Sequence, residues 1–144
     1  MPYSTMKTIA RRKRVAPKTL KTTDSYVRWR LLAASEPAVI DPVGVTFDAD
    51  GAMYVVEMGG YPTQSEGAPP LGRVKRLTDE DLDGYYETGT LFANELQYPT
   101  SVLPWRAGVL VTQPPDILFL RDDNGDGIAD IRETLFTGFP VANT

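Results

Sequence analysis

The sequence predicts an all-β fold, and three observations support this prediction. From about residue 41 onward, short apolar runs alternate with turn residues, which is the pattern of antiparallel strands. An acidic loop occurs twice, beginning at Asp79 and again 43 residues later at Asp122. The order of strand-like segments around the first loop is repeated around the second. A repeat of this length is typical of one four-stranded blade of a β-propeller.

The first repeat contains four segments with strand character. The turn signal Asp48-Ala-Asp-Gly51 separates the first two segments. The second segment is β-branched and aromatic, as buried strands are. Residues 59–72 are rich in Gly and Pro and are expected to form a loop before the third segment. The first acidic loop then precedes the fourth segment. The expected strands are 43–47, 53–57, 73–77 and 85–92.

The second repeat follows the same order, with strands expected at 99–103, 109–112, 117–120 and 134–136. Its first turn falls at 105–108, and its acidic loop again follows the third strand. The two units predict about two four-stranded antiparallel blades of an incomplete β-propeller, at about 41–95 and about 98–140. A single β-sandwich of about eight strands is the alternative, although a sandwich does not require its halves to repeat in sequence.

Strand direction predicts where the loops lie. Strands alternate in direction in an antiparallel meander, so the turns after the first and third strands share one end of a blade. Both acidic loops are therefore expected at the same end as Asp48 and Asp50. The loop 59–72 follows a second strand and is expected at the opposite end.

Charge divides the chain into two parts. Residues 1–30 carry nine Lys or Arg and one acid, whereas residues 31–144 carry six Lys or Arg and eighteen acids. We expect residues 1–25 to be a basic disordered tail and residues 26–144 to be the partial propeller. A solvated tail is favoured over nucleic-acid or anionic-membrane contact. No apolar segment follows the basic stretch as in a secretory signal, and none approaches the ~20 residues that cross a bilayer.

Two residue types are absent from the sequence, and their absence excludes several kinds of chemistry. Without cysteine the chain has no disulfide, zinc–thiolate site, covalent haem attachment or thiol catalysis. Without histidine it lacks the commonest general base and the commonest transition-metal ligand. No Gly-rich phosphate loop and no nucleophile–base pair is visible either. The sequence therefore offers no catalytic residue.

The acidic loops have the residue pattern of calcium-binding loops. Oxygen donors at alternate positions, followed by Gly, are what a hard cation such as Ca²⁺ takes from a short turn. The candidate ligands of the first loop are Asp79, Asp81, Asp83 and Glu87. Those of the second loop are Asp122, Asn124, Asp126, the Ile128 carbonyl, Asp130 and Glu133.

The two loops differ at the closing position of the pattern. Glu133 closes the second loop, whereas Thr90 occupies this position in the first. We therefore expect Ca²⁺ at both loops and weaker binding at the first. Simple turn formation by Asp, Asn and Gly is the alternative. An EF-hand is rejected, because the segment before the second loop is strand-like rather than helical.

Several segments carry a resemblance to a known family, among them Tyr54-Val-Val-Glu-Met58 and Gly72-Arg-Val-Lys-Arg-Leu77. The full set is 34–37, 41–42, 47–51, 54–58, 61–62, 72–77, 99–105, 108–111, 115–118 and 138–139. Residues 26–144 resemble the N-terminal propeller of bacterial membrane-bound dehydrogenases, which are similar to the quinoprotein glucose/sorbosone dehydrogenases. The resemblance implies an exported or periplasmic propeller that oxidises sugars or alcohols with pyrroloquinoline quinone (PQQ), in many cases joined to a c-type haem domain.

The chain departs from this family in lacking the histidine base and the haem-binding cysteines. We expect an N-terminal fragment of a dehydrogenase-like propeller that is inactive alone and whose acidic loops bind Ca²⁺. The remaining blades or another chain would cover its open sheet edges. The alternative is a non-catalytic calcium-stabilised module that binds carbohydrate or a protein through the loop 59–72 and Trp105. Nucleic-acid binding through residues 7–21 is a third, less favoured class.

Overall fold

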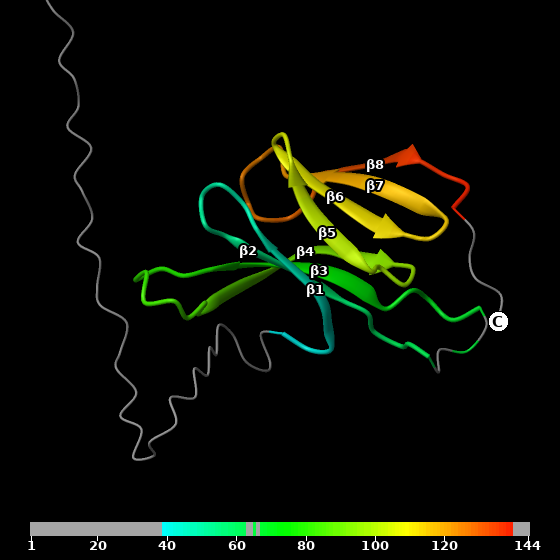
Figure 1. The fold of residues 1–144 in the computed structure, drawn as a ribbon, viewed down its shortest axis with the longest axis horizontal. Coiled ribbons are helices and arrows are strands. Elements are labelled where there is room, and N and C mark those ends of the chain that lie inside the picture. The colour runs from blue at the N-terminus through cyan, green and yellow to red at the C-terminus, as the bar shows by residue number, and fades with distance from the viewer. Residues whose placement is uncertain (1–38, 63–64, 66, 140–144) are drawn as a thin grey trace, which may run out of the picture.

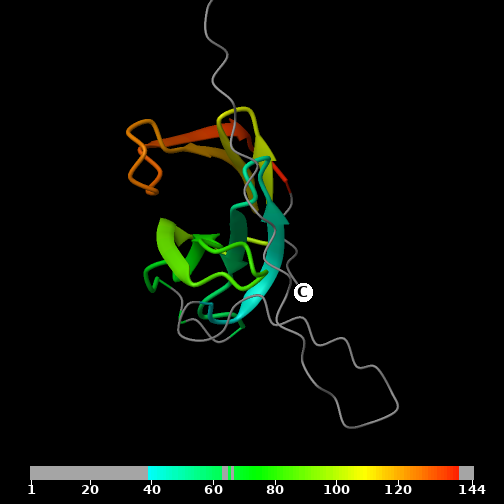
Figure 2. The ribbon, with the colours of Figure 1, turned by 90° about the vertical axis from the view of Figure 1, so that its left-hand side faces the viewer.

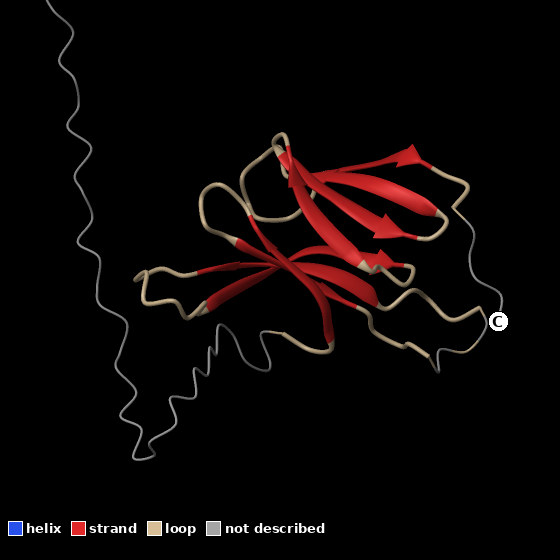
Figure 3. Cartoon of the chain, in the orientation of Figure 1, coloured by secondary structure: helices blue, strands red, loops and turns tan. Residues whose placement is uncertain are grey.

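The structure is a computed structural model that describes residues 39–62, 65 and 67–139. All regular structure in this part of the chain is β-strand (Figures 1 and 3). The strands are β1 (Pro42–Phe47), β2 (Met53–Glu57), β3 (Gly72–Thr78), β4 (Thr88–Leu96), β5 (Ser101–Trp105), β6 (Gly108–Gln113), β7 (Asp116–Arg121) and β8 (Ile131–Phe136).

These strands form two antiparallel sheets of four, in the orders β1-β2-β3-β4 and β5-β6-β7-β8. We call them the first blade and the second blade. Every strand pairs with the strand that follows it in sequence, as in a propeller meander. The all-β prediction and the two four-stranded units are confirmed. The predicted tail, residues 1–25, lies outside the described residues, as do residues 26–38 and 140–144.

The strand bounds follow the predicted segments closely, and the largest shift is in β4. This strand begins at Thr88 rather than at residue 85 and continues to Leu96. Residues 85–87 still belong to the acidic loop, because the Glu87 carboxylate accepts the backbone N–H of Glu80 at 3.2 Å. Register shifts in the β3–β4 pair accommodate the longer strand.

The two blades pack face against face, and this contact holds the main core. The Tyr54 and Phe92 rings meet edge to face, with centroids 5.3 Å apart. β5 of the second blade lies against β1 and β2 of the first. The first blade contributes Tyr54, Val56, Val74, Phe92 and Leu96, and the second contributes Val102, Val109, Val111, Leu118 and Leu120. The apolar positions in the segments therefore form one continuous interior across both repeats.

A smaller core lies on the other face of the first blade. Met53, Val55 and Leu77 are buried there beneath Val39 and Tyr86. β2 is consequently covered on both faces, which agrees with its continuous β-branched and aromatic sequence.

The acidic loops lie at one end of the blades, as strand direction predicts. In Figure 1 both loops and the turns after β1 and β5 lie on the left, whereas the loop between β2 and β3 lies on the right. Figure 2 turns the acidic-loop end toward the viewer. The Asp48 carboxylate shapes the β1–β2 turn by accepting the N–H groups of Asp50 and Ala52, at 3.0 and 2.9 Å. Gly51 takes the positive φ of 87° that this turn requires.

Each blade holds a residue shortly before its first strand by the same kind of hydrogen bond. In the first blade the Ile40 N–H donates to the Glu57 carboxylate at 2.7 Å. In the second the Gln97 N–H donates to the Gln113 side-chain oxygen at 3.0 Å. We call this contact the entry bond. The two blades are thus equivalent in detail as well as in strand order.

The acceptor in the first blade is a buried charge. Glu57 is 1% exposed, and its carboxylate lies 2.7 Å from Arg73 Nε and 3.2 Å from Lys75 Nζ. Both cations come from β3, the neighbouring strand. Two positive charges therefore compensate a carboxylate that burial alone would destabilise.

The part of the chain that the structure describes contains no helix of the length and hydrophobicity that crossing a membrane requires.

Candidate metal centre

The first acidic loop joins β3 to β4, and its carboxylates are held by the backbone of the loop itself. Alternate acidic residues accept N–H groups from residues two to five positions further on, and the last one reaches back to the start of the loop. Asp79 accepts the N–H of Gly84 at 2.8 Å, and Asp81 accepts that of Asp83 at 3.1 Å. Asp83 accepts the N–H of Tyr85 at 2.9 Å, and Glu87 accepts that of Glu80 at 3.2 Å.

This folding brings the four predicted ligands of the first loop together. One carboxylate oxygen from each of Asp79, Asp81, Asp83 and Glu87 lies within 4.8 Å of the others. Gly84 has a positive φ of 92°, which lets the chain reverse around the group. Among the residues that the structure describes, three or more acidic side chains converge in this way only here.

The second acidic loop joins β7 to β8 and repeats the hydrogen bonds of the first, position by position. Asp122 accepts the N–H of Gly127, and Asn124 accepts that of Asp126, both at 2.8 Å. Asp126 accepts the N–H of Ile128 at 2.8 Å, and Asp130 accepts that of Asp123 at 2.9 Å. Each bond joins the same two positions of the loop as its counterpart in the first loop.

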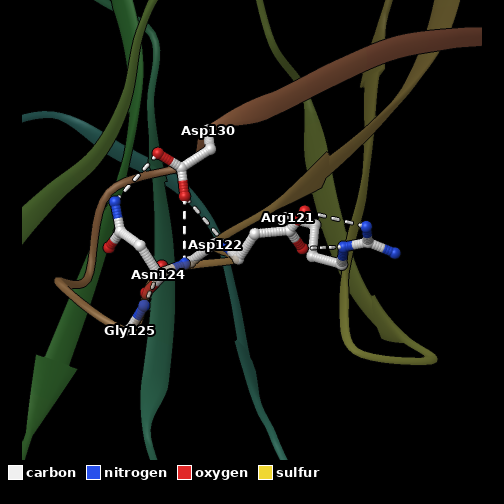
Figure 4. Close-up of polar contacts among 6 residues, drawn as sticks. Arg121, Asp122, Asn124, Gly125 and Asp130 are labelled. Atoms are coloured by element: carbon white, nitrogen blue, oxygen red, sulfur yellow. Dashed lines mark hydrogen bonds and ion pairs between the residues drawn. The ribbon is translucent and has the colours of Figure 1, made fainter.

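The loops differ where Asn124 replaces the carboxylate of Asp81. The Asn124 side-chain amide donates to Asp130 at 3.0 Å, as Figure 4 shows. Asp130 also accepts the Asn124 backbone N–H at 3.2 Å. These bonds engage both Asp130 oxygens, and the acids of the second loop are not gathered as those of the first are. The expectation of weaker binding at the first loop thus finds no support in the arrangement of the carboxylates.

Two further predicted ligands lie at the edge of the second loop. Ile128 belongs to the loop backbone through its N–H bond to Asp126. Glu133 lies on β8 opposite Phe119, where its charge acts on Arg121. In an EF-hand the twelfth residue reaches back from a helix, whereas here a strand has begun at Ile131. Glu133 is therefore not part of a gathered group of acids.

Backbone donors stabilise the charged form of the second loop. The Gly127 N–H, supported by that of Gly125, lowers the pKa of Asp122 below its ordinary value, against a smaller opposing effect of burial. The pKa of Asp123 is also lowered, chiefly by its hydrogen bond with Arg121. The Arg121 guanidinium forms a paired contact with this carboxylate, drawn in Figure 4.

The second loop and the start of β8 also join the two blades, a role that the sequence did not predict. The Ala129 N–H donates to the Phe92 carbonyl at 2.8 Å. The Arg132 guanidinium donates to the carbonyls of Asn94 and Glu95 at 3.1 and 3.0 Å. All three acceptors belong to β4 of the first blade. In the sequence, the signal for this role is Arg132, two positions after Asp130. Its partners on β4 could not be known from the sequence.

We expect Arg132→Ala to lower the free energy of unfolding by about 1 kcal/mol, because two charge-assisted bonds between the blades are lost at an exposed site. Urea denaturation followed by fluorescence measures this change. Arg121→Ala is the matched control, because Arg121 bonds to Asp123 within the second blade. Equal losses in the two variants would contradict a role of Arg132 between the blades.

A groove of about 530 Å³ runs between the blades at the acidic-loop end. Its lining includes Tyr54, Arg76, Trp105, Arg106 and Asp122. Burial raises the pKa of Tyr54, and nearby Arg76 opposes this effect. The Trp105 ring packs edge-on against Phe119 of its own blade, with centroids 5.4 Å apart, and Arg106 lies over it at 4.1 Å. Trp105 therefore packs within its own blade.

The two segments proposed for carbohydrate or protein binding lie at opposite ends of the blades. Trp105 belongs to the acidic-loop end, whereas the described part of the loop 59–72 lies at the other end (Figure 1). They do not form one binding surface. A ligand-binding surface that includes Trp105 would therefore consist of residues that line the groove, and the loop 59–72 would not belong to it.

Comparison with known proteins gives one match. A family model described as a domain of unknown function (DUF7133) matches residues 18–144. The match covers both blades and begins within the stretch that the sequence analysis assigned to the tail. Searches of curated proteins and of solved structures find no match.

Proposed function

The chain belongs to the family of the DUF7133 domain, and on this premise we propose that its two blades form a propeller module whose acidic loops bind Ca²⁺. The ion would fix the loops at one end of each blade. The first loop would be the principal site. This role is structural, and no catalytic residue is assigned.

The observation that carries the proposal is the convergence of four carboxylates in the first loop. The segment 79–87 holds five acidic residues and no Lys or Arg. At 4.8 Å two like charges repel by about 1 kcal/mol even in bulk water. Several such pairs oppose the folded loop, and a bound cation would turn this repulsion into attraction.

The donor set fits a hard cation. All donors in the first loop are oxygens, and the sequence contains neither histidine nor cysteine. Zinc and copper sites are usually built from these two residues. Ca²⁺ accepts six to eight oxygens in flexible geometry, so backbone carbonyls and water can complete the shell around Asp79, Asp81, Asp83 and Glu87. When bound, the ion would supply charge neutralisation and cross-linking of the loop.

Thermal unfolding with Ca²⁺ and with a chelator tests the proposal. A ligand present at a hundred times its Kd stabilises by about 2.7 kcal/mol. For a chain of this size that corresponds to a rise in Tm of roughly 5–10 °C. We expect Asp83→Ala to remove most of this rise, and Asp126→Ala to remove the part that the second loop contributes. Calorimetric titration gives the number of sites.

Asp50→Ala is the matched control. Asp50 is an exposed acid at the same end of the blades and lies outside both loops. Its variant should retain the full rise in Tm with Ca²⁺. No shift in Tm at millimolar Ca²⁺ would refute the metal site. Equal effects of all three variants would mean that Ca²⁺ acts on the general surface charge and not at a specific site.

The dehydrogenase-like function implied by the resemblance remains a prediction. PQQ is a quinone with three carboxylic acid groups. The groove of this chain presents Asp48, Asp50 and Asp122 beside Arg76 and Arg106. A tricarboxylate would meet like charges there, so the groove does not fit PQQ, and we derive no reaction step through the quinone.

A further inference from the structure

The face of the first blade that is directed away from the second blade is only partly covered. Its centre consists of Met53, Val55 and Leu77, which are buried beneath Val39 and Tyr86. We call this surface the outer face of the first blade. Because its centre is an apolar core, the surface is built to be covered and not to be solvated.

Apolar side chains around this centre remain exposed. Val45 on β1 pairs directly with Val55 and is 59% exposed. Phe47, two residues further along the same strand, is 53% exposed, and Leu91 on β4 is 42% exposed. Neighbouring strands lie about 4.8 Å apart, so these groups directly adjoin the buried centre. The cover over the centre therefore ends beside apolar groups of the same face, and such surfaces are typical of interaction sites.

The first blade lacks the device by which the second blade holds its neighbour. In the second blade, Arg132 donates to two carbonyls of β4 in the first. Gly89 stands at the corresponding position of the first blade, 43 residues earlier. Tyr86 corresponds to Ala129, but its hydroxyl donates to the Gly51 carbonyl of its own blade at 3.0 Å. The outer face of the first blade is therefore not built like the face that meets another blade.

The chain itself leads onto this face. Val39, the first residue that the structure describes, is one of the two residues that cover the centre. The following residue, Ile40, is fixed by its bond to the Glu57 carboxylate at 2.7 Å. The preceding residues are therefore attached beside the exposed groups. The family match begins at residue 18, so residues 18–38 belong to the same family domain as the blades.

The preceding segment has the composition that this surface requires. Residues 26–34 read Tyr-Val-Arg-Trp-Arg-Leu-Leu-Ala-Ala and contain no acid. The apolar residues Val27, Trp29 and Leu31 alternate with two arginines. In an extended chain this order directs the three apolar side chains to one side and both cations to the other. Trp29 stands ten residues before the first described residue, and ten extended residues span up to about 33 Å.

We propose that residues 26–34 bind the outer face of the first blade and cover Val45, Phe47 and Leu91. The segment would extend the cover that Val39 begins. Its apolar side chains would lie against the blade, and its arginines would remain in water. The occupant of the face is then the chain that enters the blade, and Trp29 is its largest apolar contact.

Fluorescence of Trp29 tests the proposal in the full chain. The sequence contains two tryptophans, so Trp105→Phe leaves Trp29 as the only one. In the folded chain we expect blue-shifted emission and acrylamide quenching several-fold weaker than in urea. Val45→Asp in this background should shift the emission to the red and restore the quenching, because a charge replaces an apolar contact. Phe136→Asp is the matched control, since Phe136 is 61% exposed but lies on the second blade.

Limited trypsin digestion tests the same contact in the unsubstituted chain. Cleavage after a basic residue requires a stretch of backbone that the protease can bind. We expect rapid cleavage within the basic run 11–14 and much slower cleavage after Arg28 and Arg30. Mass spectrometry of the products distinguishes these positions. Cleavage after Arg28 or Arg30 at the rate seen within residues 11–14 overturns the proposal.

The fluorescence experiment has its own contrary outcomes. Trp29 that is quenched as strongly in the folded chain as in urea overturns the proposal. So does Trp29 that is released by Phe136→Asp and not by Val45→Asp. Leu91→Asp replaces Val45→Asp if circular dichroism shows that the latter unfolds the chain. The test is independent of Ca²⁺, and its failure would leave the metal proposal untouched.

Discussion

Phe92→Ala should lower the free energy of unfolding by about 3–5 kcal/mol, the range for removing a buried aromatic side chain. Phe92 is 2% exposed and lies in the contact between the blades. Its ring packs edge to face on Tyr54 at 5.3 Å. The substitution removes apolar burial and the aromatic contact, and it leaves a cavity between two sheets that their loops hold in place.

Phe136→Ala is the matched control for this prediction. The same residue type lies on the last strand of the second blade, opposite Ile117, but is 61% exposed. We expect a loss below about 0.5 kcal/mol, as for surface substitutions. Chemical denaturation of both variants measures the difference. Equal losses would mean that Phe92 does not owe its role to the blade contact.

Glu57→Ala should be the second most damaging change, with a loss of about 3 kcal/mol. Removing one member of a buried ion pair leaves its partners uncompensated, at a cost of about 3–5 kcal/mol. We take the lower end because Arg73 is 37% exposed and can turn toward water. Lys75, at 14% exposure, has less freedom to do so. The variant also removes the acceptor of the Ile40 N–H.

Glu57→Gln separates the charge from the hydrogen bond. The amide oxygen can still accept the Ile40 N–H, as Gln113 does for Gln97 in the second blade. We therefore expect Glu57→Gln to be less destabilising than Glu57→Ala in urea denaturation, and the difference to contain the entry bond together with the packing of the buried side chain. If the two variants lose the same stability, neither the entry bond nor the side-chain packing contributes, and the ion pairs account for the whole effect.

The strands could be predicted because local signals define them. Asp48-Ala-Asp-Gly51 specifies a turn through its own side chain and glycine, and the run Met53–Glu57 is too β-branched for a loop. The acidic loops marked the repeat, and strand direction then placed them correctly at one end. These features depend on residues close together in the chain.

Features that depend on distant partners could not be predicted. The bonds of Arg132 to β4 require knowing which faces of the blades meet. Predicting the ion pairs of Glu57 requires knowing the register in which β2 pairs with β3. The expectation of tighter Ca²⁺ binding at the second loop stays a prediction. The Asn124 amide is a donor as well as an acceptor, and it engages the carboxylate of Asp130.

The entry bond has a consequence for where one blade ends and the next begins. A residue shortly before each first strand is held by the blade that it enters, through Glu57 or Gln113. The natural boundary between modules therefore lies between Leu96 and Gln97. Gene duplication or engineering that cuts the chain there moves donor and acceptor together, whereas a cut a few residues later would separate them.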